Sequence, residues 1–203
     1  MGLAFIRVPH RIAIGATLGQ DVVRPHLDAL ARRRGEPSTV VIDLSEVEAA
    51  NASFLKATLL ELLWRGQAYA DAEDSPSGPP RDALNVFPLV QGLSPEVREE
   101  LETVLSSERM PALESVVSDA DRIVSGRVLG RLDDALTITL AALTSEGSST
   151  APQLCEKYPQ RNVIKATAWN NRLADLYRHR LVTRERAGRQ WIYGAIAKEL
   201  ADG

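Results

Sequence analysis

Short, almost wholly apolar runs recur along the first part of the chain, and each is followed by a longer amphipathic segment. Residues 38–45 (STVVIDLS) and 83–90 (ALNVFPLV) have the composition of strands that are buried on both faces of a sheet. Residues 4–14 are rich in β-branched side chains and are typical of a strand or a hairpin, and residues 111–117 predict one more strand.

Helices are predicted between these strands, over residues 19–35, 51–66 and 93–105. The last of these begins with Ser94 at the N-cap and Pro95 at the first helical position. Residues 70–82 are polar and rich in Pro and Gly, as expected of a surface loop. Because strands and helices alternate, we expect an α/β fold with a mainly parallel sheet flanked by helices.

From Leu132 onwards the pattern changes. Three helices are predicted over residues 132–147, 148–159 and 161–180, and Asn162 is a candidate N-cap for the third. Residues 181–196 alternate, turn at Ala187-Gly188 and return as a second strand. Three helices followed by a hairpin are the order of a winged helix-turn-helix, a small α+β fold.

These two patterns predict two domains. We expect the first at residues 1–120, a linker at residues 121–131, and the winged helix at residues 132–203. The polar stretch before Leu132 is the reason for placing the linker there.

Charge is distributed unevenly between the two parts. Residues 150–203 hold ten Lys or Arg and five Asp or Glu, while residues 1–149 hold 14 and 22. A basic segment in a chain of net charge −3 indicates contact with a polyanion. A basic surface helix that arose by chance is the alternative explanation.

Composition limits the class of protein. An apolar fraction of 44% and a charged fraction of 25% are those of a folded chain. The sequence has no apolar run of about 18 residues, so no membrane span is expected. The first residues carry charges and a proline too early for an export signal, and Cys155 is the single cysteine, so we expect a cytoplasmic protein.

The third C-terminal helix has the two faces that a recognition helix needs. On a helical wheel Trp169, Leu173 and Leu176 share one side with Ala166, and this side is expected to pack on the preceding helices. The opposite side would face the major groove, where Asn can bond adenine in bidentate fashion and Lys can meet guanine or phosphate. The expected DNA-binding residues are Lys165, Thr167, Asn170, Asn171, Arg172, Arg178, Arg184, Arg186 and Arg189.

The hairpin is expected to act as the wing. Its arginines would hold phosphates, which fix the register of a protein on DNA without reading sequence. If about six of the cations contact phosphates, log K should fall with log salt with a slope of about −5. Trp191 and Tyr193 could stack on bases, although their position in the hairpin favours packing against the domain.

The C-terminal part resembles the winged-helix transcriptional regulators of the MarR and penicillinase-repressor kind. The resemblance is carried by NNRLADLYRHRLVTRERAGRQWIY, in which a recognition helix leads into a wing, and it covers about residues 132–197. Many members of that group have Gly where this chain has Arg180. The resemblance implies binding to double-stranded DNA, although some winged helices bind proteins.

The N-terminal part resembles a STAS domain, the fold of anti-sigma-factor antagonists. VVIDLS, NASF and GLSPEVREEL occur in the order of that family, over about residues 4–117. Ser53 matches the serine that a partner kinase phosphorylates in the antagonists, whereas Asn51, Ala52 and Phe54 depart from the motif. The resemblance implies a protein partner and a switch at Ser53. The alternative is that Ser53 or Asn51 only caps the helix.

Catalytic or metal chemistry is not expected. His10, His26 and His179 are scattered, and no Cys/His cluster has the spacing of metal ligands. Asp133 and Asp134 are explained by the first turn of a helix, where negative charge is favourable. We therefore expect no cofactor, no metal and no enzymatic activity.

Together these features predict a DNA-binding regulatory protein. Its winged helix would contact duplex DNA, and its STAS-like domain would provide protein contacts or signal input. A homodimer is a hypothesis from operator symmetry, since paired half-sites raise affinity. The alternative is a non-enzymatic protein-interaction module of a partner-switching or multi-subunit system, for example in defence, with Ser53 as the switch.

Overall fold

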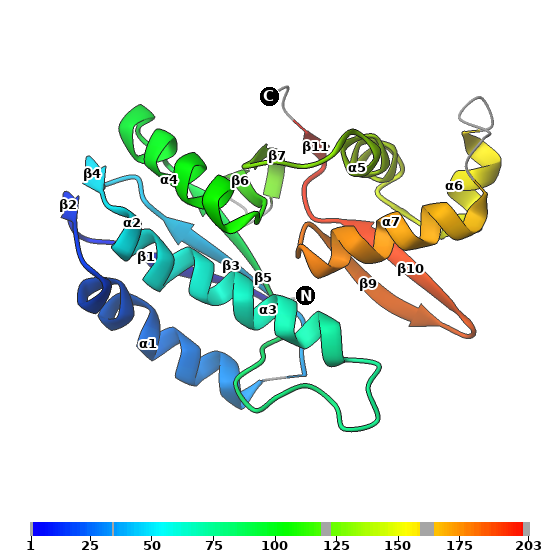
Figure 1. Cartoon of the computed structure of the whole chain (residues 1–203), viewed down its shortest axis with the longest axis horizontal. Helices are drawn as coiled ribbons and strands as arrows, with labels where there is room; N and C mark the ends of the chain where they lie inside the picture. The colour runs from blue at the N-terminus through cyan, green and yellow to red at the C-terminus, as the bar shows by residue number, and fades with distance from the viewer. Residues whose placement is uncertain (1, 34, 119–122, 159–164, 201–203) are drawn as a thin grey trace.

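A computed structural model of the chain describes residues 2–33, 35–118, 123–158 and 165–200. Its centre is a six-stranded sheet (Figure 1). The strand order is β1 (Gly2–Arg7), β3 (Ser38–Asp43), β5 (Val86–Gln91), β6 (Ala112–Val117), β7 (Ile123–Leu129) and β11 (Glu199–Leu200). The first four strands are parallel, β7 is antiparallel to β6, and β11 is parallel to β7. The expected α/β class with a mostly parallel sheet is confirmed.

One face of the sheet is covered by the helices that connect its strands. They are α1 (Ala16–Arg32), the continuous α2 (Ala52–Leu55), η1 (Lys56–Leu60) and α3 (Glu61–Ala72), and α4 (Pro95–Glu108). Alternate strand residues, Val40 and Ile42 of β3 and Val86 and Val90 of β5, enter one core cluster with these helices. Ser94 accepts a hydrogen bond from the Val97 N–H at 3.2 Å and starts α4 as expected.

The C-terminal elements pack on the opposite side of the same strands. Val41, Phe87, Leu89 and Leu113 of the sheet share a second core cluster with C-terminal helices and strands. These elements are α5 (Asp134–Glu146), β8 (Ser148–Ser149), α6 (Ala151–Lys157), α7 (Ala166–Arg178), β9 (Val182–Ala187) and β10 (Gln190–Ala195). The second sheet, of order β8-β10-β9, belongs to them. The order of three helices and a hairpin is that expected of a winged helix.

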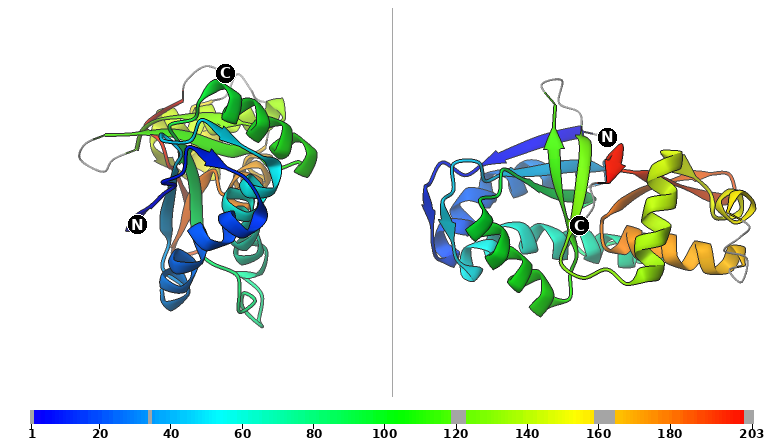
Figure 2. Two further views of the ribbon diagram at one scale, coloured as in Figure 1. Left: turned by 90° about the vertical axis from the view of Figure 1, so that its left-hand side faces the viewer. Right: turned by 90° about the horizontal axis from the view of Figure 1, so that it is seen from above.

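The first apolar run forms a strand but not a hairpin. β1 pairs with β3, while β2 (Ile12–Ala13) pairs in parallel with β4 (Ala49–Ala50). In Figure 1 and in the right-hand view of Figure 2, β2 and β4 lie at one end of the long axis, and α6 and the β9–β10 turn lie at the other.

The expected linker at residues 121–131 is wrong for its described part. Residues 123–129 form β7, which pairs along β6 from Val117↔Ile123 to Ala112↔Leu129. Strand β11, at the other end of the C-terminal part, also returns to the sheet through Glu199↔Ser125. The β-branched residues of IVSGRVL favour a strand, and this signal was hidden between polar neighbours. The domain division stays a prediction, but its two parts share a sheet and a core.

The second helix runs past its expected end at Gly66. Gly66 lies inside α3, which continues to Ala72. A Cβ at this position would lie 2.9 Å from the Val86 carbonyl oxygen and 3.0 Å from Cγ of Arg180. Gly66 is therefore required by close packing against β5 and Arg180 and does not end the helix. None of the helices in the described residues is both long and apolar enough to span a bilayer.

Candidate nucleic-acid interface

Helix α7 presents its expected polar face to solvent. Trp169, Leu173 and Leu176 are buried in the second core cluster, as the helical wheel predicts, whereas Ala166 is only half-buried. The N-cap is Lys165, and the expected cap Asn162 lies outside the described residues. On the opposite side of the helix, Lys165, Thr167, Asn170 and Asn171 are exposed.

The hairpin of β9 and β10 forms a wing beside this helix. Its last pair is Ala187↔Gln190, so the turn consists of Gly188 and Arg189, one residue later than expected. Gly188 has φ 62°, a conformation that favours glycine. Tyr193 is 1% exposed and packs in the core, which is what its position in the hairpin predicts. Trp191 is half-buried.

A hollow of about 430 Å³ lies between the wing and the N-terminal ends of α6 and α7. Its walls include Pro152, Ala166, Thr167, Asn170, Arg189 and Trp191. Three of the expected DNA-binding residues, Thr167, Asn170 and Arg189, therefore face one cavity. Lys165 and Asn171 are exposed on the same helix end, and Arg172 is half-buried.

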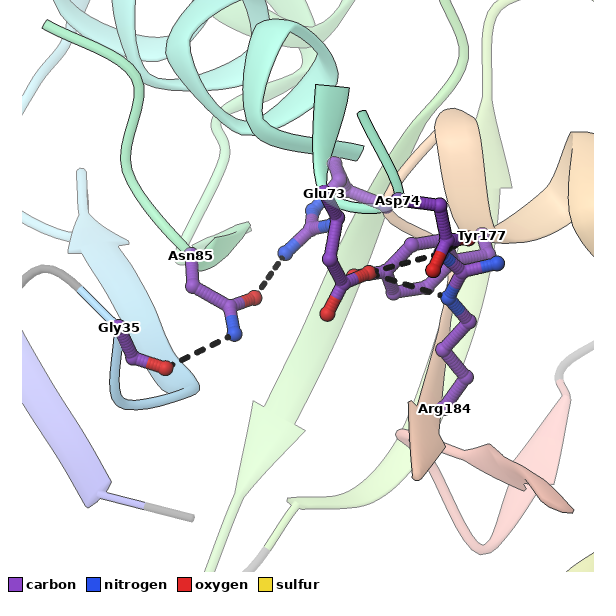
Figure 3. A network of polar contacts seen from close by, with 7 residues as sticks. Gly35, Glu73, Asp74, Asn85, Tyr177 and Arg184 are labelled. Carbon is purple, nitrogen blue, oxygen red and sulfur yellow. Dashed lines mark hydrogen bonds and ion pairs between the residues drawn. The ribbon is translucent and has the colours of Figure 1, made fainter. Parts of the chain in front are cut away.

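Two expected DNA-binding arginines are held elsewhere. Nε of Arg178 donates to Oδ1 of Asp71 at 2.6 Å. Arg184 donates to Oε2 of Glu73 from Nε at 3.1 Å and from Nη2 at 2.8 Å, and to Oδ2 of Asp74 at 2.8 Å. Figure 3 shows how Arg184, Glu73 and Asp74 lie against one another. The Arg184 side chain is only 8% exposed. Asp71, Glu73 and Asp74 form an acidic cluster. Four of the six expected cations do not pair with it: Lys165, Arg172, Arg186 and Arg189.

The acidic cluster lies at the C-terminal end of α3, in the segment that the sequence predicts to be a surface loop. Negative charge at a helix C-terminus is unfavourable unless cations compensate it, and the last turn of α3 contains none. Arg178 and Arg184 provide this compensation from α7 and β9. Burial lowers the pKa of Arg184, but the hydrogen bonds and charge of Glu73 outweigh it and the pKa is raised.

Tyr177 links the same cluster to the core. Its hydroxyl donates to Oε2 of Glu73 at 2.7 Å, so this one oxygen accepts hydrogen bonds from both Tyr177 and Arg184. Burial, together with the negative charge of Glu73, raises the pKa of Tyr177 to about 12. The phenol therefore stays protonated at neutral pH and can donate to Glu73 there.

Arg180 is the residue that sequence reasoning missed. It is 1% exposed, and its guanidinium donates to the Val86 carbonyl at 2.7 Å and to Oδ1 of Asn85 at 2.6 Å. Cζ lies 3.9 Å from the ring centroid of Phe87 and 4.7 Å from that of Tyr177. The backbone φ of Arg180 is 59°. The one signal in the sequence was the expected resemblance to winged-helix regulators, many of which have Gly at the position of Arg180.

Ser53, the other expected site residue, is exposed at the opposite end of the molecule. The helix cap is Asn51, whose Oδ1 accepts from the N–H groups of Phe54 at 3.0 Å and Gly15 at 3.1 Å. Ser53 is therefore not the N-cap of this helix. Ile12 on β2 and Ile14 just after it are 62% and 57% exposed.

The double role of Asn51 leads to a prediction. Asn51→Ala should lower the free energy of unfolding by about 2 kcal/mol, because a helix cap and a tie to the α1 loop are lost together. Asp133→Ala, which removes a single cap bond to the Leu136 N–H, should cost only about 1 kcal/mol. Urea denaturation of both variants measures the difference. Equal losses would mean that the Gly15 contact contributes no stability.

Among the described residues, no three His, Cys, Asp or Glu side chains gather as metal ligands. Comparison with known proteins gives no family model, no curated protein and no solved structure that matches this chain.

Proposed function

We propose that the chain binds duplex DNA through α7 and the wing. The observation that carries the proposal is the hollow between these two elements, which has Thr167 and Asn170 on its helix wall and Arg189 on its wing wall. A polar helix end beside a basic hairpin is the arrangement with which winged helices enter the major groove and touch the flanking backbone.

The exposed residues suit distinct contacts with DNA. Asn170 and Asn171 can each bond an adenine edge, and Thr167 can contact a base or a thymine methyl. Lys165 lies at the helix N-terminus, where it can reach guanine or phosphate. Arg172, Arg186 and Arg189 would hold phosphates and set the register.

The proposal extends to regulation. The N-terminal part, which resembles a STAS domain, would receive a signal or a protein partner at the end of the molecule that carries Ile12, Ile14 and Ser53. This end is far from the wing along the long axis (Figure 1), so both surfaces could be occupied at once. The C-terminal part would then act as the DNA-binding output.

The first test is fluorescence anisotropy on a random 30-base-pair duplex at several salt concentrations. If the four cations outside the acidic cluster contact phosphates, log K should fall with log salt with a slope of about −3.6. Six phosphate contacts would give about −5. A homodimer that places two wings on one duplex would roughly double the slope. Absence of binding at low salt would contradict the proposal.

Paired variants locate the surface. Lys165→Ala with Arg189→Ala should reduce the slope to about −1.8, because two phosphate contacts are removed. Arg24→Ala with Arg32→Ala is the matched control, since both arginines are exposed on α1. If the control changes the slope as much as the test pair, DNA binding does not reside at the wing.

A protein-interaction module is the second candidate function. The exposure of Ser53 beside two exposed isoleucines favours it. A phosphate there would sit at a helix N-terminus, where negative charge is tolerated, and would add almost two charges to an apolar surface. Mass spectrometry of the chain isolated from its own cells should then find phosphate on Ser53, and Ser53→Asp should release a co-purifying partner that Ser53→Ala retains. An unmodified Ser53 and equal co-purification with both variants would contradict this candidate.

A further inference from the structure

Arg184 lies between two aromatic rings. Its Cζ is 4.3 Å from the ring centroid of Tyr177 and 4.1 Å from that of Trp191. At the same time its guanidinium is bonded to Glu73 and Asp74, as Figure 3 shows. A cation that is stacked on two rings, paired with two carboxylates and only 8% exposed is poorly placed to reach a phosphate.

These contacts belong to a longer stack that starts in the central sheet. Arg180 lies on Phe87 of β5 and on Tyr177 of α7, and Arg184 lies on Tyr177 and on Trp191. Arg186 continues the stack, with its Cζ 4.9 Å from the Trp191 ring centroid. Guanidinium groups and rings therefore alternate from a buried strand to the wing.

Trp191 gives this stack a consequence for the interface, because its side chain lines the hollow between α7 and the wing. A displaced Trp191 ring would change the shape of the hollow, whose other walls carry Asn170 and Arg189. Arg184 contacts both the Trp191 ring and the carboxylates of Glu73 and Asp74, so it joins the hollow to the acids at the end of α3.

We propose that Arg184 is a positioning residue for the DNA-binding surface, one that Glu73 and Asp74 hold against Trp191 so that the wing keeps its place beside α7. The proposal rests on the proposed DNA-binding function and assigns the acids of α3 a role in it. Arg184 makes no phosphate contact, and Glu73 strengthens DNA binding even though its charge repels DNA.

Removal of Glu73 distinguishes a positioning role of Glu73 from competition with DNA phosphates for Arg184. If Glu73 merely competes with phosphates for Arg184, Glu73→Ala should tighten DNA binding. If Glu73 positions Arg184, the variant should weaken binding about fivefold to tenfold, the effect of losing about one ordinary hydrogen bond. Asp71→Ala is the matched control: it removes the same charge from the same helix end, but among the described residues its partner Arg178 stacks on no aromatic ring. Binding by Glu73→Ala that equals or exceeds binding by Asp71→Ala overturns the proposal.

The salt slope separates positioning from direct contact. Arg184→Ala should weaken binding while the slope stays at the wild-type value. Loss of a phosphate contact would instead reduce the slope by about 0.9. A reduced slope overturns the proposal and restores Arg184 to the set of DNA contacts.

A readout without DNA keeps the two proposals distinct. In protein labelled with 5-fluorotryptophan, the ¹⁹F signal of Trp191, assigned with Trp191→Phe, should shift in Glu73→Ala and Arg184→Ala but not in Asp71→Ala. An unshifted signal in both variants overturns the positioning role even if the wild type binds DNA. A shifted signal with no DNA binding by the wild type supports the positioning of Trp191 and overturns only the proposed function.

Discussion

Arg180→Gly should lower the free energy of unfolding by about 2–4 kcal/mol, although it relieves an unfavourable backbone conformation. The variant leaves Oδ1 of Asn85 and the Val86 carbonyl without their donor, at about 1–3 kcal/mol for each buried acceptor. It also opens a cavity under Phe87 and Tyr177 and removes the cation from both rings. The gain from a glycine at φ 59° is only about 1 kcal/mol.

Arg109 provides the matched control. It ends α4 at φ 55°, the same left-handed conformation, but its side chain is exposed. Arg109→Gly should therefore change stability by between zero and about 1 kcal/mol in the favourable direction. Urea denaturation followed by far-ultraviolet circular dichroism measures both variants. Small changes of the same sign would show that Arg180 contributes no more than its backbone conformation.

Most elements were predictable because their signals are local. The apolar runs of β3 and β5 predict buried strands, and Ser94-Pro95 predicts the first turn of α4. Thr150 and Gln153 form the capping box of α6, a signal that lies within four residues of sequence. Each of these signals depends on side chains within four residues of one another.

The candidate site was only partly predictable, because its decisive contacts are long-range. Arg180 reaches Val86 across 94 positions of sequence, and Arg184 reaches Glu73 across 111. No local pattern in either segment indicates its partner. Exposed Thr167, Asn170 and Asn171 were predictable because helical periodicity alone sets which face of α7 they occupy.

The charge asymmetry illustrates the same limit. The excess of cations after residue 150 predicted a surface for a polyanion. In the folded chain part of that charge is compensated internally, because Asp71, Glu73 and Asp74 lie against Arg178 and Arg184. The basic surface is therefore smaller than the sequence indicates and is concentrated near the wing turn and the start of α7. A shallower salt slope is the measurable consequence.

Trp169→Ala should have the largest effect on stability, about 3–5 kcal/mol, because it removes a large, fully buried side chain from the second core cluster. This cluster includes Leu89 and Leu113 of the central sheet, so we expect the loss to be felt by both parts of the chain. Trp64→Ala is the control, since Trp64 is 40% exposed on α3 and its removal should cost no more than about 1 kcal/mol.

Hydrogen exchange measured on peptides shows where the Trp169 loss is felt. If the C-terminal elements and the sheet unfold as one cooperative unit, peptides from β3 and β5 should lose protection in Trp169→Ala together with peptides from α7. The shared cluster and the return of β11 to the sheet are the physical reasons for this expectation. Loss of protection in α7 alone would mean that the C-terminal elements fold as a separate domain. Their packing on Val41 and Phe87 of the central sheet argues against this outcome.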